Sequence, residues 1–187
     1  MNKNFSLTDV QALRKQARLH IEEGAVTSGY TADRNIMLKL LNDALATELI
    51  CVLRYRRHHF MAKGIESKSI ADEFLVHANE ELGHADMIAE RIVQLGGEPN
   101  FSPDTLAGRS HAEYIEADSL VNMIKENLVA ERIAIGSYRE IIQYLGDQDP
   151  TTRRMLESIL AVEEKHAEEM ADLMGGLPPR MSRSGIS

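Results

Sequence analysis

The sequence lacks tryptophan and is poor in several other residue types, with one cysteine, five prolines, five tyrosines and four phenylalanines in 187 residues. The single cysteine, Cys51, excludes an intramolecular disulfide, which fits a reducing compartment, and it excludes a zinc site built from several thiolates. Glycine and proline are bunched at a few places, and the stretches between them have the composition of long helices. The composition therefore predicts an all-α protein of one domain.

A positive net charge and long apolar runs are also missing. The formal net charge is -8 at pH 7, which disfavours wholesale binding to nucleic acid or to an anionic membrane. Lys3, Asp9 and Arg14 come before any long apolar run, so neither a signal peptide nor a transmembrane span is expected. We therefore expect a cytoplasmic protein without membrane contact.

Five segments have helical spacing of apolar residues, as in Met37 and Leu41, and glycine or proline separates them. Helices are predicted from "SLTD" (6–9) to "TSGY" (27–30), and over about 33–63, 67–95, 117–145 and 151–174. Ser6 or Thr8 would cap the first helix, and Asp33 is a good N-cap for the second.

The lengths of the connections predict how these helices are arranged. The links at 64–66 and 146–150 are short, so each joins an antiparallel pair. The link from Gly96 to about Glu116 is roughly as long as the bundle and can return the chain to its other end. The four long helices are therefore predicted to form a four-helix bundle with one long crossover, preceded by an extra N-terminal helix.

A carboxylate and an imidazole recur one helical turn apart. Glu81 and His84 lie within "EELGH", and Glu163 and His166 lie within "EEKH". The i, i+3 spacing places each pair on one helix face, where both side chains can reach the same ion.

Two further glutamates, Glu48 and Glu131, lie on the apolar stripes of the segments at 33–63 and 117–145, where a carboxylate faces the core. The chain repeats its spacing at these positions and at the tyrosines and histidines near them. The pairs that share nearly the same offset are Glu48 and Glu131, Tyr55 and Tyr138, Glu81 and Glu163, and His84 and His166. The chain thus looks like one helical hairpin used twice, which would bring these groups together near the middle of the bundle.

Four carboxylates cannot stay in a dry core as bare anions, because like charges and desolvation both raise their proton affinity. Two divalent or trivalent metal ions would neutralise them and would use the histidines as neutral nitrogen ligands. Mixed carboxylate and imidazole ligation suits iron and manganese, and the missing thiolate argues against a structural zinc site.

With these residues, the chain from about Asn35 to Met174 resembles bacterioferritin and its mini-ferritin relatives in the ferritin-like di-iron family. The resemblance implies two Fe ions per subunit, with Mn or Zn as substitutes. It implies Glu48 and Glu131 as terminal ligands, Glu81 and Glu163 as bridging ligands, and His84 and His166 as ligands of one ion each. Tyr55, on the same helix as Glu48 and two turns after it, matches a tyrosine near the site in the bacterioferritin pattern and is included among the site residues.

The sequence departs from the bacterioferritin pattern in several places. Leu82 stands where a methionine ligates haem, so haem is not expected. The C-terminal helix is replaced by a tail at 175–187 and an extension is added at the N-terminus, so the cage size stays open. The cysteine pair of some archaeal mini-ferritin-like proteins is also missing. We expect a ferritin-like bundle at 33–174, between an N-terminal extension with a short helix at 1–32 and this tail.

The resemblance implies a ferroxidase that oxidises Fe(II) to Fe(III) with O2 or H2O2 and stores or detoxifies iron as a homo-oligomer, either a cage or a dimer. One alternative is a di-iron or di-manganese oxidase or peroxidase that stores no mineral, although the cysteine-rich domain of rubrerythrin-like peroxidases has no counterpart here. The other is a DNA-protecting oligomer, because four basic residues against Asp9 give residues 1–21 a net charge of about +3.

Other charged residues have simpler interpretations. Arg54, Arg56, Arg57 and His58, in the run "RYRRHH", are expected on an exposed helix face. Glu80, which precedes Glu81, could pass metal toward the site, but the favoured interpretation is an ordinary solvated acid.

Overall fold

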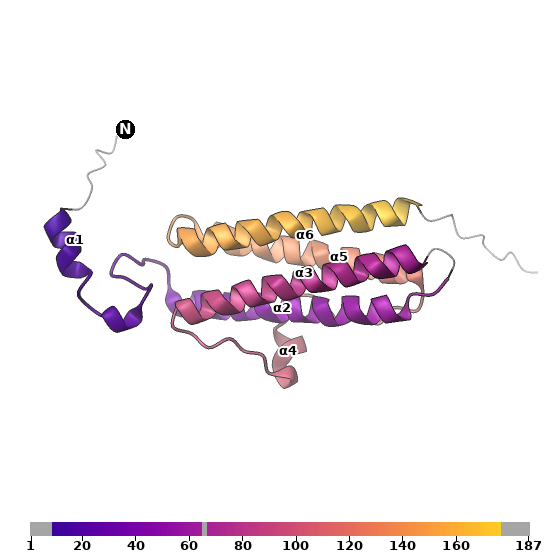
Figure 1. Ribbon diagram of the computed structural model, residues 1–187, viewed down its shortest axis with the longest axis horizontal. Helices are drawn as coiled ribbons and strands as arrows, with labels where there is room; N and C mark the ends of the chain where they lie inside the picture. The colour runs from indigo at the N-terminus through magenta and orange to yellow at the C-terminus, as the bar shows by residue number, and fades with distance from the viewer. Residues whose placement is uncertain (1–8, 65–66, 177–187) are drawn as a thin grey trace, which may run out of the picture.

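Helices are the only regular elements in the residues that the computed structural model describes, 9–64 and 67–176. In chain order they are α1 (Val10–Gln16), the 3-10 helix η1 (Ile21–Glu23), α2 (Arg34–Met61), α3 (Ser67–Gln94), α4 (Pro103–Arg109), α5 (Leu120–Leu145) and α6 (Pro150–Gly176). The four long helices lie side by side, and α1 lies beyond one end of them (Figure 1). The predicted all-α fold is confirmed.

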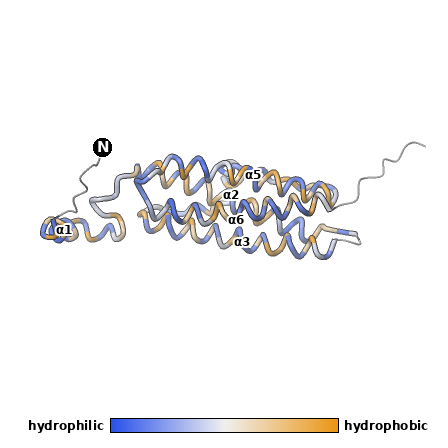
Figure 2. Tube along the Cα trace, turned by 90° about the horizontal axis from the view of Figure 1, so that it is seen from above, coloured by the Kyte–Doolittle hydropathy of each residue, from blue (hydrophilic) through white to orange (hydrophobic). Residues whose placement is uncertain are grey.

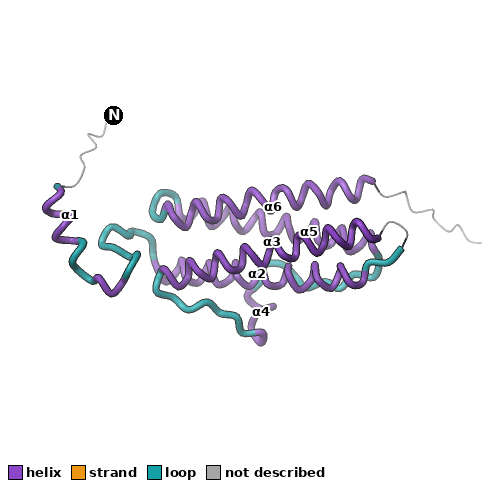
Figure 3. The backbone as a smooth tube through the Cα atoms, in the orientation of Figure 1, coloured by secondary structure: helices purple, strands orange, loops and turns teal. Residues whose placement is uncertain are grey.

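The connections set the topology of the bundle. Short links join α2 to α3 and α5 to α6, and each pair packs as an antiparallel hairpin. The chain between α3 and α5 contains α4 and returns along the bundle to the end where α5 begins (Figure 3). Across the hairpins, α2 contacts α5 and α3 contacts α6. The predicted four-helix bundle with one long crossover is confirmed, whereas the sequence pattern does not predict α4.

Side-chain caps fix where two of the long helices begin. The Asp33 side chain accepts hydrogen bonds from the backbone N–H groups two and three residues later, at 3.0 and 3.1 Å, so Asp33 is the N-cap of α2 as predicted. α5 begins at Leu120, slightly later than the predicted start near Ala117, because Ser119 caps it by accepting a bond from the backbone of Asn122.

Two glycines end α3. Gly96 has a φ of +76°, in the left-handed region that favours glycine, and a Cβ on Gly97 would lie 2.3 Å from Leu38 Cδ2 of α2. The "GG" pair therefore lets the chain leave α3 while staying in contact with α2.

The N-terminal helix is shorter than predicted. Its N-cap is Asp9, which accepts a bond from the backbone N–H two residues later at 3.1 Å. Ser6 and Thr8, the predicted caps, lie outside the described residues, as does the tail from 177 to 187. α1 ends at Gln16 and has no buried residue, so it lacks the tertiary packing that normally extends a helix in water.

The apolar core is split into two clusters along the bundle. One includes Leu41, Ile88, Leu145 and Leu156, and the other includes Phe74, Ile124, Ala130 and Met170. Hydrophilic and hydrophobic residues alternate at short intervals along the long helices (Figure 2), as expected of helices with one buried face. Within the described residues, no helix combines the length and apolar character needed to cross a membrane.

The interpretation of "RYRRHH" as an exposed face is wrong for two of its residues. Arg54 and His58 are buried, and Arg54 Nε and His58 Nδ1 each lie 3.1 Å from the side-chain oxygen of Asn127 on α5. Arg54 also donates to the Glu113 carbonyl at 2.9 Å, and His58 Nε2 lies 3.1 Å from the Ile115 carbonyl. The two side chains thus hold the crossover against α2 through partners that are distant in the sequence.

A buried ion pair joins α3 to the start of α6. Arg91 Nη2 donates to both carboxylate oxygens of Asp149 at 3.0 Å, and Arg91 Nε donates to the Thr152 hydroxyl at 2.7 Å. Asp149 also accepts from the Thr152 backbone N–H at 2.9 Å. Burial alone would raise the pKa of Asp149, but the hydrogen bonds from Thr152 and Arg91 outweigh burial and lower it.

We predict that Asp149→Ala lowers the free energy of unfolding by about 3–5 kcal/mol, because it leaves the Arg91 guanidinium buried without its carboxylate. Urea unfolding of metal-free protein at pH 7 measures this. Since the folded pKa of Asp149 is lowered, its contribution is present above the unfolded pKa of about 3.9 and is lost as the pH falls through the folded pKa. The difference between parent and variant should therefore shrink below about pH 4.

The control is Asp147→Ala, which removes one of the two exposed carboxylates that pair with Arg153 and should change stability little. Equal losses in the two variants would contradict a special role for the buried pair.

Candidate metal centre

Six acidic and imidazole side chains meet in the middle of the bundle, between the two apolar clusters. They are Glu48 from α2, Glu81 and His84 from α3, Glu131 from α5, and Glu163 and His166 from α6. All six are buried, and the highest relative exposure among them is 5%, at His84. These are the six residues that the sequence predicts as ligands, and the fold brings all of them together.

The six residues form two groups that share two members. In each group, one potential ligand atom per residue lies within 4.8 Å of the others; the groups are Glu48, Glu81, His84 and Glu163, and Glu81, Glu131, Glu163 and His166. Glu81 and Glu163 belong to both groups, as bridging carboxylates would. Each group takes three residues from one hairpin and one from the other.

The histidine nitrogens face the carboxylates closely. His84 Nδ1 lies 2.8 Å from Glu163, 3.1 Å from Glu81 and 3.5 Å from Glu48. His166 Nδ1 lies 3.3 Å from Glu81. One ring nitrogen carries at most one hydrogen, so it cannot serve three carboxylates equally. A cation placed among these oxygens would meet all of them.

Two buried tyrosines hold the outer carboxylates. The Tyr55 hydroxyl of α2 donates to Glu131 of α5, and the Tyr138 hydroxyl of α5 donates to Glu48 of α2. Each tyrosine therefore orients the glutamate of the other hairpin, which matches the equal spacing of the two tyrosines and the two glutamates in the sequence. Tyr55 lies at the site, as predicted, and Tyr138 is its symmetric counterpart.

Several buried atoms of the site have no hydrogen-bond partner among the described residues. They are Glu48 Oε2, Glu81 Oε1, Glu131 Oε2, Glu163 Oε1 and His166 Nδ1. Some of these atoms lie at ion-pair distance from a histidine, but without the direction of a hydrogen bond. Buried polar atoms are normally satisfied, so five such atoms at one point of the core fit a site for cations.

The electrostatics of the site also favour a cation. Burial and the neighbouring carboxylates raise the pKa of Glu81 and of Glu131 well above the usual range, and they raise that of Glu163 to about 8. For Glu48 burial acts upward, but hydrogen bonds from His84 and neighbouring groups lower the pKa. Burial lowers the pKa of His84, yet the three surrounding carboxylates outweigh it and raise the pKa to about 12. Without metal, the site therefore retains protons at neutral pH.

The donor set fits iron. It offers carboxylate oxygens and imidazole nitrogens, which suit iron and manganese. The one thiol, Cys51, is buried, and burial raises its pKa well above the ordinary value, so no thiolate competes for the ions. Two glutamates from separate helices plus two Glu-x-x-His pairs form the ligand set of di-iron helical bundles.

Sequence reasoning missed one residue beside the site and one contact of another. His77 of α3 is fully buried, one turn before Glu81, and its ring stacks on that of His166 with centroids 4.0 Å apart. Glu80 is partly exposed, but its carboxylate lies 2.6 Å from His166 Nε2. The i−4 spacing of His77 from Glu81, on the same helix face, is the signal that could have found it.

Fold and site together define a class of protein, the helical bundle whose core holds a cluster of glutamates and histidines. A family model, the Ferritin-like domain, matches residues 38–178. The chain belongs to the ferritin-like domain family.

Several relatives are similar over most of this chain. Bacterioferritin from Mycobacterium leprae is 33% identical over 146 residues, which are 75% of this chain and 87% of the relative. The DNA protection during starvation protein from Pyrococcus furiosus is 32% identical over 152 residues, 80% of this chain and 82% of the relative. The solved structure of a dodecameric thioferritin, the bacterioferritin-related protein from Bacteroides fragilis, is 30% identical with a TM-score of 0.74 and covers 76% of this chain and 86% of its own.

We predict that metal binding releases protons at pH 7, because Glu163 and His84 hold protons there and must lose them to act as ligands. Calorimetric titration of metal-free protein with Zn(II), in buffers of different ionisation enthalpy, measures the number released. Since the raised pKa of Glu163 is about 8, the release should decrease as the pH rises through that value.

The variant Glu163→Gln should release fewer protons than the parent. The exposed neighbour Glu164, paired with Arg139, offers the matched control Glu164→Gln, which should behave as the parent does. Zn(II) binding without proton release in the parent would show that the site is already deprotonated.

Proposed function

We propose that this protein is a ferroxidase that oxidises Fe(II) to Fe(III) at the centre within each subunit and stores or detoxifies the product. The observation that carries the proposal is the pair of donor groups that share Glu81 and Glu163. It provides adjacent positions for two Fe(II) ions, with Glu48 and His84 completing one position, and Glu131 and His166 the other.

The reaction balances with two irons. Oxidation of two Fe(II) ions to Fe(III) supplies two electrons, which with two protons reduce O2 to H2O2, or reduce H2O2 to two molecules of water. The four carboxylates stabilise Fe(III) more than Fe(II), because Coulomb attraction grows with the charge of the ion. The hydrogen bonds from Tyr55 and Tyr138 keep Glu131 and Glu48 oriented toward the ions.

The relatives support storage in an assembly. Two of them are a bacterioferritin and a thioferritin described as dodecameric, so we propose a homo-oligomer here as well. Large apolar side chains such as Phe60 and Val93 are exposed on the single chain, and subunit contacts would cover such residues. Leu82, which replaces the haem-ligating methionine of bacterioferritin, is the reason that haem has no place in the proposal.

We predict that metal-free protein oxidises the first two Fe(II) ions per chain rapidly in air and then forms a soluble mineral as more Fe(II) is added. Ferric absorbance, followed from two to several hundred irons per chain, measures both phases. Glu81→Ala removes a carboxylate shared by both positions and should abolish the rapid phase, whereas Glu164→Ala on the exposed face should retain it.

The outcomes separate the candidate functions. Fast oxidation that stops at two irons per chain would leave a di-iron oxidase that stores no mineral. Equal rates in Glu81→Ala and the parent, with both folded by circular dichroism, would sink the proposed centre. If Mn(II) outcompetes Fe(II) for the site, a di-manganese oxidase becomes the better proposal.

DNA protection is a second candidate function. One relative is a DNA protection during starvation protein, and the basic residues Arg14, Lys15 and Arg18 are exposed in and next to α1. Gel retention of DNA at low salt that disappears when residues 1–21 are deleted would support it. No retention by the full chain would dismiss it.

A further inference from the structure

A third cluster of donor groups lies between α3 and α6, outside the centre described above. His77 Nε2 lies 3.0 Å from Glu169 Oε2 and 3.4 Å from Glu73 Oε1. These three residues each place a potential ligand atom within 4.8 Å of the others. The His77 side chain is fully buried, whereas those of Glu73 and Glu169 are 38% and 32% exposed. The cluster therefore has a buried imidazole at its floor and two carboxylates at its mouth.

A surface pocket gives access to this cluster. It has a volume of about 430 Å³ and is lined by Glu73, Glu169, Asp172, Ile70 and Leu173, among others. Lys165 Nζ lies 3.1 Å from Glu169 Oε1, so it pairs with the oxygen of Glu169 that does not face His77. Three carboxylates against one ammonium leave the pocket negative, which favours a cation.

Both ring nitrogens of His77 have a partner. The single hydroxyl hydrogen of Tyr55 is donated to Glu131, and the Tyr55 oxygen lies 3.2 Å from His77 Nδ1. When the Tyr55 hydrogen is on Glu131, His77 Nδ1 can donate to the Tyr55 oxygen, and in that neutral tautomer Nε2 carries the lone pair. Nε2 lies 3.0 Å from Glu169 and 3.4 Å from Glu73, so an ion in the place of its hydrogen would have three electron-pair donors around one point.

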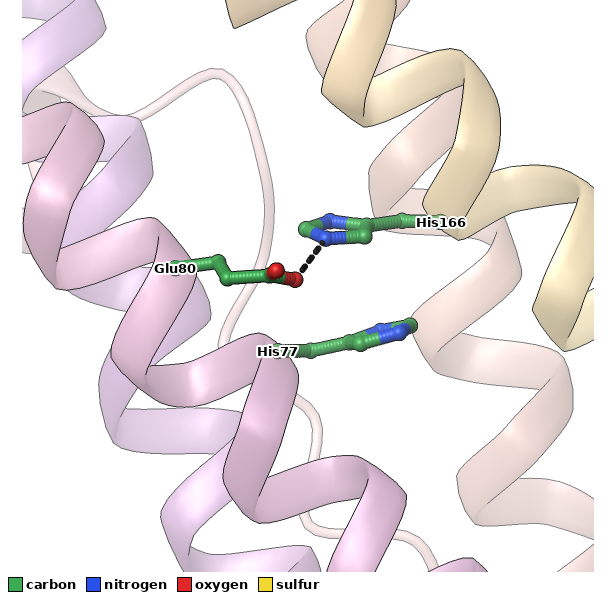
Figure 4. Close-up of side chains that lie close together, drawn as sticks. All are labelled: His77, Glu80 and His166. Atoms are coloured by element: carbon green, nitrogen blue, oxygen red, sulfur yellow. Dashed lines mark hydrogen bonds and ion pairs between the residues drawn. The ribbon is translucent and has the colours of Figure 1, made fainter.

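The cluster continues toward the centre through shared residues. His77, Glu80 and His166 form a further group within 4.8 Å, in which Glu80 binds His166 at 2.6 Å and the two rings stack (Figure 4). His77 belongs to the outer group and to this one, and His166 belongs to this one and to the centre. An ion moving inward would meet a donor already present at each step.

Within the part of the chain that the structure describes, the other half of the bundle has no such group of donors. The offset that relates Glu81 to Glu163 also maps Glu73, His77 and Glu169 onto Met155, Ile159 and Met87. None of these counterparts offers a carboxylate or an imidazole, and Ile159 lies in the apolar core. The outer cluster is therefore an addition to one side of a repeated structure.

We propose that Glu73, His77 and Glu169 form a third site for a divalent transition-metal ion, from which the ion passes by Glu80 and His166 to the centre. The passage rests on the proposed ferroxidase function, whereas the third site does not. Fe(II), Mn(II), Co(II) and Zn(II) all match its mixed imidazole and carboxylate donors.

Cobalt tests the site without any oxidation of iron. Equilibrium dialysis of metal-free protein against Co(II) should load three ions per chain in the parent and two in the double variant Glu73→Gln/Glu169→Gln. The matched control is Asp72→Asn/Glu168→Gln, which removes two charges at the neighbouring exposed positions of the same helices and should still load three. Anomalous diffraction at the cobalt edge should place the third ion beside His77 Nε2.

Two results would overturn the third site. Two Co(II) ions per chain in the parent would mean that His77 and the two glutamates form only a hydrogen-bonded network, with His77 as an imidazolium. A third ion that persists in Glu73→Gln/Glu169→Gln would place that ion elsewhere.

Stopped-flow oxidation tests the passage. With less than two Fe(II) ions per chain, Glu73→Gln/Glu169→Gln should slow ferric absorbance several-fold while the final amplitude stays that of the parent, and the Asp72→Asn/Glu168→Gln control should match the parent rate. Unchanged rates in the double variant would overturn the passage. A third Co(II) ion in a protein that catalyses no iron oxidation would sink the ferroxidase proposal and leave the site standing.

Discussion

The structure depends on one electrostatic constraint, the burial of four carboxylates at one point of an apolar core. No dry core holds four such charges without positive partners. The remaining features of the bundle follow from that point. The apolar residues form two clusters because the polar groups lie between them. Tyrosines occupy positions that a core would otherwise give to leucine, because each must donate to a glutamate. The four helices must also stay in register, since a shift of one residue would turn a ligand away from the others.

Repetition lets a short chain meet this constraint. The hairpins α2–α3 and α5–α6 carry the same types of donor residue at matching positions along their helices. When one hairpin packs against the other, both donor groups are therefore completed together. The approximate symmetry ends beside the centre, where His77 and Glu80 have the apolar counterparts Ile159 and Val162. Apolar side chains therefore pack at these positions in α6, whereas polar side chains occupy the matching positions in α3. The two donor groups are inequivalent for this reason, although their residue types match.

The sequence was most informative where a pattern is local. Helix periodicity and the Asp33 cap predict the long helices because both depend on residues within one or two turns. The Glu-x-x-His spacing and the repeated offsets between the two hairpins predict which side chains converge. By contrast, α4 has seven residues and no buried one, and contacts such as the hydrogen bond from Arg109 to the Asn42 carbonyl hold it against α2. No local sequence pattern near α4 predicts such a contact.

Burial of polar residues was the least predictable property. Their position in a basic run predicts that Arg54 and His58 lie on the surface, but both are buried in contact with Asn127 and two carbonyls of the crossover. His77 escaped notice for a similar reason: its spacing from Glu81 places it on the ligand face of α3, but the partners that show its role, Tyr55, Glu169 and His166, lie on other helices. In each case the deciding partner lies on another helix or in the crossover, several turns or more away along the chain, beyond the reach of any local pattern.

Each donor group draws three residues from one hairpin and one from the other, so the centre is also an interface between the two hairpins. An ion held there would clamp two halves of the molecule that are otherwise joined covalently only by the crossover, which contributes no residue to either group. Two copies of a single two-helix chain, docked about a twofold axis, would build the same pair of positions. The chemistry of the site would then belong to the pairing of hairpins, and the crossover would serve to keep the pair together as one chain.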